Sequence, residues 1–272
     1  MGDISPRAIE VLRSVDVIAA EDTRVTGRLL ERIDVKKRMV SYREETERRL
    51  APGLVARLAE GQSIALVSDA GTPGVSDPGY RLVRAAADAG VEVVAVPGPS
   101  AVVALLSISG LPTDRFAYEG FAPAKASARR HALERLRGAG RTVVFFESPH
   151  RVVALLEDIA EILGDPPVAV GRELTKLYEQ VLRGAASEVA AHFTTHAPRG
   201  EFSVAVHIEA AETELAGDEL ERRVAALIAE GRTTREIAAA LKPSGAHHRE
   251  IYAVVQRLRG AGPAPRTRGT SQ

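Results

Sequence analysis

The sequence predicts an α/β protein with two α/β domains and a helical C-terminal extension. Short apolar runs typical of buried strands alternate with longer runs typical of helices, a pattern that implies parallel βαβ units. The alternation stops at residues 111–114, where Pro112 follows Leu111, and then starts again. We therefore assign residues 1–112 and 113–210 to the two α/β domains, 217–259 to the helical extension and 260–272 to a disordered tail.

The first half begins with a helix-start signal, because Ser5 is a good N-cap residue and Pro6 suits the first helical position. Further helices are expected at residues 44–60, 80–89 and 100–109. Pro52 is expected to kink or break the first of these. Strands are expected at residues 15–19, 39–42, 63–67 and 91–96.

In the second half, strands are expected at residues 116–120, 142–147, 168–171 and 202–208, with a strand or turn at 177–182. Helices are expected at residues 127–136 and 152–163. The extension resembles a helix-turn-helix around residues 233–236.

Composition excludes several classes of protein. The 272 residues contain no cysteine, which excludes a disulfide scaffold, a cysteine metal site and a thiol nucleophile, and which fits a cytoplasmic protein. The 36 basic and 36 acidic residues balance, so any RNA partner must be held by a local patch. The start of the chain lacks an export signal. The most apolar stretch, 91–111, is interrupted by Pro97 and Pro99, and is therefore predicted to be a strand, a turn and a helix.

The strongest binding signal is the segment 68–79, between an expected strand and an expected helix. Ligands in open α/β sheets bind beyond the carboxyl ends of strands, and this loop exceeds the usual two to six residues. Its glycines permit close backbone approach to a ligand, its two prolines fix its shape, and Asp69 and Asp77 supply charge. The alternative is a structural loop capped by aspartates. The segment lacks the P-loop and the G-x-G-x-x-G patterns.

Other loops follow the expected strands. The turn at 97–101 contains Ser100, which can cap the next helix, so a tight turn remains as plausible as a ligand contact. The segment 22–24 is a further loop at a strand end, and it gives weaker evidence for a ligand site. In the second half, two of these loops contain side chains that can donate, accept or transfer protons. They are Glu147-Ser148-Pro149-His150-Arg151 and Arg172-Glu173-Leu174-Thr175-Lys176. Each residue alone is explained better by an ion pair or a cap than by a ligand site, but two such clusters at equivalent sheet edges favour a site between the halves.

Residues 115–141 form a basic cluster with seven basic side chains against two acidic ones. The cluster is either a phosphate-binding face or an ordinary solvated helix face. We predict that Arg115, Arg129, Arg130 and Arg137 contact RNA. Aromatic residues make up only 4% of the chain, which disfavours single-strand binding by an aromatic platform.

Six motifs together resemble the ribosomal RNA small subunit methyltransferase I family. They are Asp69-Ala70-Gly71-Thr72-Pro73-Gly74-Val75-Ser76-Asp77-Pro78-Gly79-Tyr80, Val96-Pro97-Gly98-Pro99-Ser100-Ala101, Ser109-Gly110-Leu111-Pro112-Thr113-Asp114-Arg115-Phe116, Glu119-Gly120-Phe121, Phe146-Glu147-Ser148-Pro149-His150-Arg151 and Arg172-Glu173-Leu174-Thr175-Lys176. They occur in the family's order, and the resemblance extends from Gly2 to about Leu258.

The resemblance implies a tetrapyrrole-methylase fold, in which S-adenosylmethionine binds in a cleft between two α/β domains, usually in a homodimer. It implies 2′-O-methylation of the ribose of cytidine 1402, in the decoding centre of 16S rRNA, with no metal and no membrane. The cofactor-binding residues it implies are Asp69, Ala70, Gly71, Pro73, Gly74, Ser76, Asp77, Pro97, Gly98, Ser100, Ala101, Glu147, Arg172 and Thr175. Glu147, Glu173 and Lys176 are the catalytic candidates, and the general base is left open.

Two other function classes stay open: a methyltransferase of the same fold that acts on a small molecule such as a tetrapyrrole, and an RNA-binding protein without catalysis. The family pattern also has a buried strand and a Thr-Pro-Ile-Gly-Asn-Leu turn just before Gly-Asp-Ile-Ser. Here Met1 directly precedes Gly2. We therefore expect an additional strand, about ten residues with its turn, encoded upstream.

Overall fold

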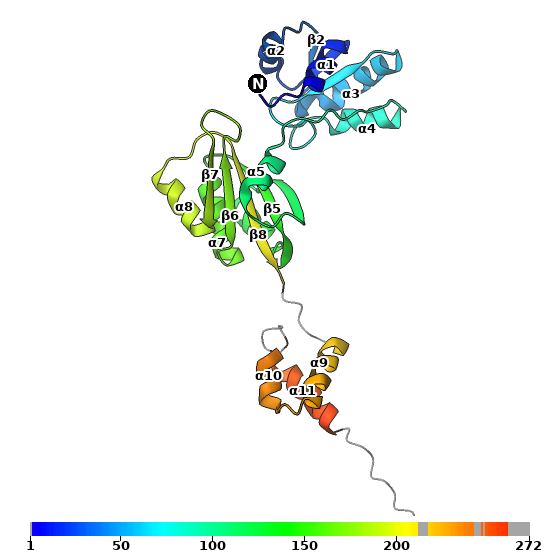
Figure 1. Cartoon of the computed structure of the whole chain (residues 1–272). Coiled ribbons are helices and arrows are strands. Elements are labelled where there is room, and N and C mark those ends of the chain that lie inside the picture. The colour runs from blue at the N-terminus through cyan, green and yellow to red at the C-terminus, as the bar shows by residue number, and fades with distance from the viewer. Residues whose placement is uncertain (1, 212–216, 242–245, 247, 261–272) are drawn as a thin grey trace, which may run out of the picture. The chain divides into compact units, whose positions relative to one another are not determined.

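The computed structural model describes residues 2–211, 217–241, 246 and 248–260 (Figure 1). The helices are α1 (Pro6–Ser14), α2 (Thr23–Arg32), α3 (Glu44–Ala59), α4 (Tyr80–Asp88), α5 (Ala101–Ser109), α6 (Ala126–Glu134), α7 (Val152–Leu163), α8 (Ala186–Thr195), α9 (Gly217–Ala229), α10 (Thr234–Leu241) and α11 (His248–Gly260). The strands are β1 (Val17–Ala20), β2 (Arg38–Ser41), β3 (Ile64–Val67), β4 (Phe116–Phe121), β5 (Ala139–Glu147), β6 (Pro167–Arg172), β7 (Gln180–Ala185) and β8 (Phe202–Ala210).

The first sheet is parallel, with the order β2-β1-β3. Its central strand β1 is buried along its whole length. Ile18 and Ala20 pack into one cluster, whereas Ala19 packs into another that contains Tyr42, so both faces of the sheet are covered. Helix α1 begins as expected, because Ser5 accepts a hydrogen bond from the backbone N–H of Ala8.

The prediction of a buried strand at residues 91–96 was wrong. The described residues pair no strand with this segment, and β3 is an edge strand of the described sheet. Val93 and Val94 are 51% and 58% exposed. A β-strand needs a neighbour for its backbone N–H and C=O groups, and valine content alone does not provide one. The upstream strand that we expect stays a prediction.

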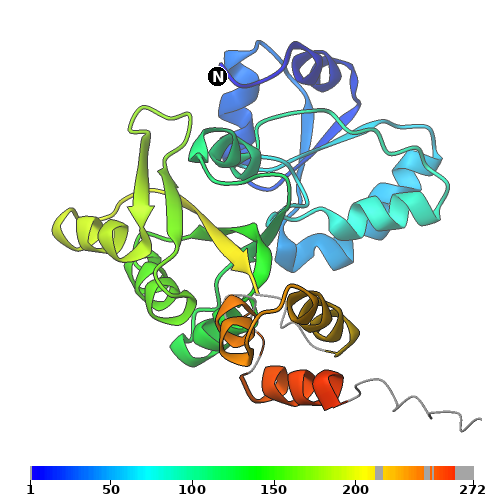
Figure 2. The ribbon, with the colours of Figure 1, turned by 60° about the horizontal axis from the view of Figure 1, so that its bottom comes forward.

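The second sheet has the order β4-β5-β8-β6-β7 and is mixed, not wholly parallel as the alternation implied. β4 and β5 are parallel, whereas β6 is antiparallel to both β7 and β8. A seven-residue connection joins β6 to β7, which is long enough for an antiparallel pair and too short for a parallel crossover. One face of this sheet packs against α5, through Val102, Leu105 and Leu106. Helices α7 and α8 lie on the other side (Figure 2).

Three further expectations changed. Helix α3 runs unbroken through Pro52. Helices α2 and α8 lie in regions where no helix was expected. Asp22 was expected to lie in a loop. It is the N-cap of α2, and its carboxylate accepts a hydrogen bond from the backbone N–H of Arg24 at 2.8 Å. Helix α2 contains Gly27 and two threonines, which are weak helix formers, so its composition does not indicate a helix.

Residues 137–140 and the described residues between 209 and 260 belong to a second compact unit, distinct from the unit of residues 2–136 and 141–208. Its described helices α9, α10 and α11 have their own apolar core, which includes Leu220, Ile237 and Ile251. At the start of α10, the Thr233 N–H and hydroxyl both donate to Glu236, and the Glu236 N–H donates to Thr233. This capping box is the structural basis of the signal seen at residues 233–236. The predicted disordered tail falls almost wholly outside the described residues.

Candidate active site

The loop 68–79 leaves the carboxyl end of β3 and is joined to the end of β1 by hydrogen bonds. The Asp69 backbone N–H donates to the Glu21 carboxylate at 3.1 Å. In return, the Asp22 backbone N–H donates to the Asp69 carboxylate at 3.1 Å. One oxygen of Asp69 is therefore already used to hold the two strand ends together.

The same loop contacts two other predicted segments. The Thr72 hydroxyl donates to the backbone oxygen of Pro99 at 3.0 Å, which connects the loop to the turn at 97–101. The Ser76 hydroxyl lies 2.5 Å from the hydroxyl of Tyr118, on β4 of the second sheet. The structure thus brings the two predicted cofactor segments together and places them against the second α/β half.

Open space lies beside Gly71, Gly74 and Gly98 of these segments, whereas a Cβ at Gly79 would come within 2.8 Å of Leu66. Gly71 and Gly74 have φ angles of 71° and 81°, which side chains rarely tolerate. A Cβ added to Gly74 or Gly98 would meet no atom within 4 Å, and one added to Gly71 would meet only the Pro99 oxygen at 4.0 Å. Ser100 is the N-cap of α5, but its side chain makes no capping hydrogen bond. These backbone stretches are accessible to a ligand.

Asp77 is the most perturbed carboxyl group of the loop. Burial, together with the carboxylates of Glu21, Asp69 and Glu201, raises its pKa to about 6, while the Ser68 hydroxyl opposes this rise. A carboxyl group with such a pKa is suited to accept a proton near neutral pH. Glu21 and Glu201 were not predicted as site residues. Glu21 directly follows β1, so the rule that ligands bind at strand ends would have found it.

Arg172, Glu173, Thr175 and Lys176 lie in a tightly held loop after β6. Lys176 donates to Glu173 and to Glu201, each at 2.9 Å. The hydrogen bond from Lys176 holds the pKa of Glu173 below its usual value. Arg172 donates to the backbone oxygen of Arg199 at 2.7 Å. Glu173 and Lys176 therefore neutralise each other and shape the loop, which weakens the case for either as the proton acceptor.

Glu147 has a fully buried side chain at the carboxyl end of β5. Its carboxylate accepts from the Ser148 backbone N–H at 2.7 Å and from Arg151 at 2.9 Å. Both oxygens are used to fix the turn into α7. The Glu147 carboxylate is therefore engaged within the protein, and its catalytic role stays a prediction.

The predicted RNA-contacting arginines differ in their surroundings. Arg129 is only 7% exposed and donates to Asp158 at 2.7 Å, so it is not available to RNA, and the prediction for this residue is corrected. Arg130 pairs with Asp158 and with Glu161. Arg115 and Arg137 are exposed, and their contact with RNA stays a prediction. Charge counting along the sequence could not reveal the carboxylates that α7 brings to α6.

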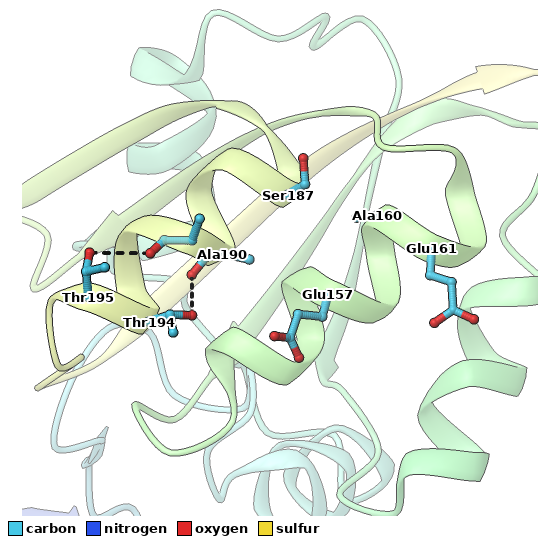
Figure 3. Close-up of a pocket in the computed structure, with 8 residues that line it drawn as sticks. Glu157, Ala160, Glu161, Ser187, Ala190, Thr194 and Thr195 are labelled. Carbon is cyan, nitrogen blue, oxygen red and sulfur yellow. Dashed lines mark hydrogen bonds between the residues drawn. The ribbon is translucent and has the colours of Figure 1, made fainter.

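An open groove of about 560 Å³ lies elsewhere, between α7 and α8 (Figure 3). It is lined by Glu157, Ala160, Glu161, Ser187, Ala190, Ala191, Thr194 and Thr195. None of the predicted site residues lines it. The hydroxyl of Thr194 donates back to its own helix, at the Ala190 oxygen. We therefore do not assign the active site to this groove.

Within residues 2–211, 217–241, 246 and 248–260, no group of three or more histidine, aspartate or glutamate side chains is placed to hold a metal ion. Among the helices described, none has the length and apolar character needed to cross a membrane.

Comparison with known proteins gives the family. Residues 1–190 match the family described as Tetrapyrrole (Corrin/Porphyrin) Methylases. The ribosomal RNA small subunit methyltransferase I of Mycobacterium tuberculosis is 44% identical over 96% of this chain and 92% of the relative. That of Escherichia coli O157:H7 is 43% identical over 93% of this chain and 89% of the relative. The chain belongs to the ribosomal RNA small subunit methyltransferase I family.

Solved structures agree with this assignment at the level of fold. The methyltransferase CobJ superposes with a TM-score of 0.56 at 19% identity, covering 79% of this chain and 92% of CobJ. A diphthine synthase superposes with a TM-score of 0.58 at 17% identity, covering 76% of this chain and 85% of that chain. The predicted tetrapyrrole-methylase fold is thereby confirmed, and the family identifies the chain as a methyltransferase.

Proposed function

We propose that this protein transfers a methyl group from S-adenosylmethionine to the ribose 2′-oxygen of cytidine 1402 in 16S rRNA, as a cytoplasmic homodimer. The observation that carries the proposal is the junction of loop 68–79 with the turn at 97–101 and with Tyr118. The loop and the turn are two of the motif segments through which the chain resembles its family. The relatives' name supports a ribosomal RNA substrate.

The residues present fit S-adenosylmethionine. Open space beside Gly74 and Gly98 permits the close backbone approach that the cofactor needs. The carboxylates of Glu21, Asp69 and Asp77 lie near one another, as their electrostatic coupling shows, and their charge complements a cationic ligand. When bound, the cofactor supplies a methyl group attached to a positively charged sulfur. Loop 68–79 and the turn at 97–101 would hold it.

Asp77 would accept the proton of the attacking hydroxyl. The group must be ionised to do so, and its pKa of about 6 keeps it largely ionised at neutral pH. Asp77 has no cationic partner among the causes that perturb its pKa, whereas Glu173 is paired with Lys176 and Glu147 with Arg151. Among the carboxyl groups of the site, Asp77 is therefore the proton acceptor that we propose.

The direct test is a methyl-transfer assay with small ribosomal subunits that lack the modification. Radiolabelled S-adenosylmethionine and the purified protein should label 16S rRNA, and mapping should place the label on the ribose of cytidine 1402. Large subunits serve as the matched control and should remain unlabelled. Label on a base, on another nucleotide, or only on an added tetrapyrrole would contradict the proposal.

A further inference from the structure

The turn between β6 and β7 exposes two large apolar side chains. Leu177 is 87% exposed and Tyr178 is 70% exposed. The turn lies beyond the ends of the two strands (Figure 1). A single exposed apolar residue is ordinary on a protein surface. Two adjacent ones at the most exposed point of a predicted active-site loop require an explanation.

The loop that carries them is held in a strained conformation. Glu173 and Thr175 have φ angles of 49° and 62°, a region that non-glycine residues rarely occupy. Backbone hydrogen bonds run from Lys176 to Glu173 at 3.0 Å and from Glu179 to Lys176 at 3.2 Å. Leu174 faces the other way and packs against the core of the second sheet. The loop therefore presents Leu177 and Tyr178 in a fixed position.

The base of this loop lies on the same apolar cluster as the residue that contacts the Asp77 segment. Leu174 and Tyr118 both pack against that cluster, and the Tyr118 hydroxyl lies 2.5 Å from the hydroxyl of Ser76, which directly precedes Asp77. A nucleotide whose ribose reaches Asp77 would therefore come close to this loop. An unstacked nucleobase offers a flat apolar face that needs a new stacking partner, and an exposed tyrosine ring provides one.

We propose that the Tyr178 ring, supported by Leu177, stacks on an RNA nucleobase next to the methylated ribose. This inference rests on the proposed function and adds a substrate-positioning contact to it. One ring makes this contact, so the low aromatic content of the chain does not argue against it. Tyr178 takes no part in the proton transfer.

The test measures KM and kcat for unmethylated small ribosomal subunits in three variants. Tyr178→Ala should raise KM about 10-fold, in the range that loss of one stacked base produces, with kcat little changed. Tyr178→Phe keeps the ring and should behave as the wild type. Phe116→Ala removes another exposed aromatic ring, 49% exposed at the start of β4, and should leave KM unchanged.

Two further measurements separate the possible outcomes. Affinity for S-adenosylmethionine, measured by calorimetry, should be the same in all variants. Light scattering should give the same oligomeric state for the wild type and all variants. A changed oligomeric state in Tyr178→Ala would show that this loop tip is a contact between copies of the chain, and would overturn the inference. An unchanged KM in Tyr178→Ala, with an active wild type, would overturn it too. If the wild type neither binds nor methylates the subunits, the proposed function itself fails, and this inference fails with it.

Discussion

Asp77 shows how the properties of one residue depend on its neighbours. Its sequence context, between Ser76 and Pro78 in the predicted binding loop, gives no sign of a raised pKa. Burial and three nearby carboxylates raise its pKa to about 6, whereas Glu173 is held below its usual pKa by Lys176. Two acidic side chains of one site are thereby given different tasks.

The Asp77 assignment predicts a pH dependence. The carboxylate accepts a proton only when ionised, so kcat should rise as the pH increases through about 6 and then level off. Asp77→Asn should lower kcat by about 10²- to 10⁴-fold and remove this rise. Glu21→Gln removes one of the charges that raise the pKa of Asp77, so the rise should move to lower pH. A wild-type profile that is flat between pH 5 and pH 8, a range set by the pKa of about 6, would refute the assignment.

Gly98 tests the predicted cofactor contact without straining the backbone. Unlike Gly71 and Gly74, it does not have a left-handed φ, and a Cβ there meets no protein atom within 4 Å. Gly98→Val should leave the fold intact and weaken S-adenosylmethionine binding by about 10-fold or more, which is about 1.4 kcal/mol. Calorimetry measures the affinity. Gly53→Val, at an equally open position in α3, is the control and should bind normally.

At the scale of elements, the pairing of α6 with α7 decides the role of Arg129. Its side chain and that of Asp158 are 9% and 11% exposed, so this is a nearly buried ion pair. Arg129→Ala should lower the free energy of unfolding by about 1–3 kcal/mol. Removing one partner of a buried ion pair usually costs about 3–5 kcal/mol, and the loss here is smaller because Arg130 still pairs with Asp158. Urea unfolding measures the loss. Binding of ribosomal subunits should not change, and a selective loss of binding would restore Arg129 to the RNA-contacting set.

The segment 91–96 has the composition of a strand and no strand neighbour among the described residues. Exposed valines with unpaired backbone groups favour association between chains. Val94→Lys should therefore slow aggregation, measured by light scattering, and change the free energy of unfolding by less than about 0.5 kcal/mol. Val103→Lys is the control, because Val103 is equally exposed at 58% but lies in a helix. Val103→Lys should slow aggregation less than Val94→Lys does. A lower free energy of unfolding in Val94→Lys would show that the Val94 side chain is covered, and would contradict the prediction.

For the whole molecule, two separate compact units predict two separate responses to core mutations. Ile237 is fully buried in the helical unit, and Leu155 is fully buried in α7 of the other unit. Ile237→Ala should lower the free energy of unfolding of the helical unit by about 2–5 kcal/mol and raise hydrogen exchange in α9, α10 and α11, while the α/β unit stays protected. Leu155→Ala should produce the converse pattern. Equal loss of protection in both units, from either variant, would show that they unfold together.

The sequence by itself determined the family, the fold class and most of the helices and strands. Strand β1 is a continuous apolar run, β5 contains one at residues 143–146, and the Ser5 cap is a local signal, so each can be found without knowing the rest of the chain. The loop motifs could be found in the same way, since glycine and proline at fixed positions specify a loop locally.

Tertiary structure alone decided which charged groups meet and which strand-like segments find a neighbour. Arg129 and Asp158 are 29 residues apart, and Asp77 and Glu201 are farther apart still, so neither the ion pair nor the raised pKa is visible in a local pattern. Likewise, the valines of residues 91–96 favour a strand, but a strand exists only when another backbone satisfies its hydrogen bonds. Electrostatic shifts and sheet pairing both depend on distances through space, which the order of residues does not fix.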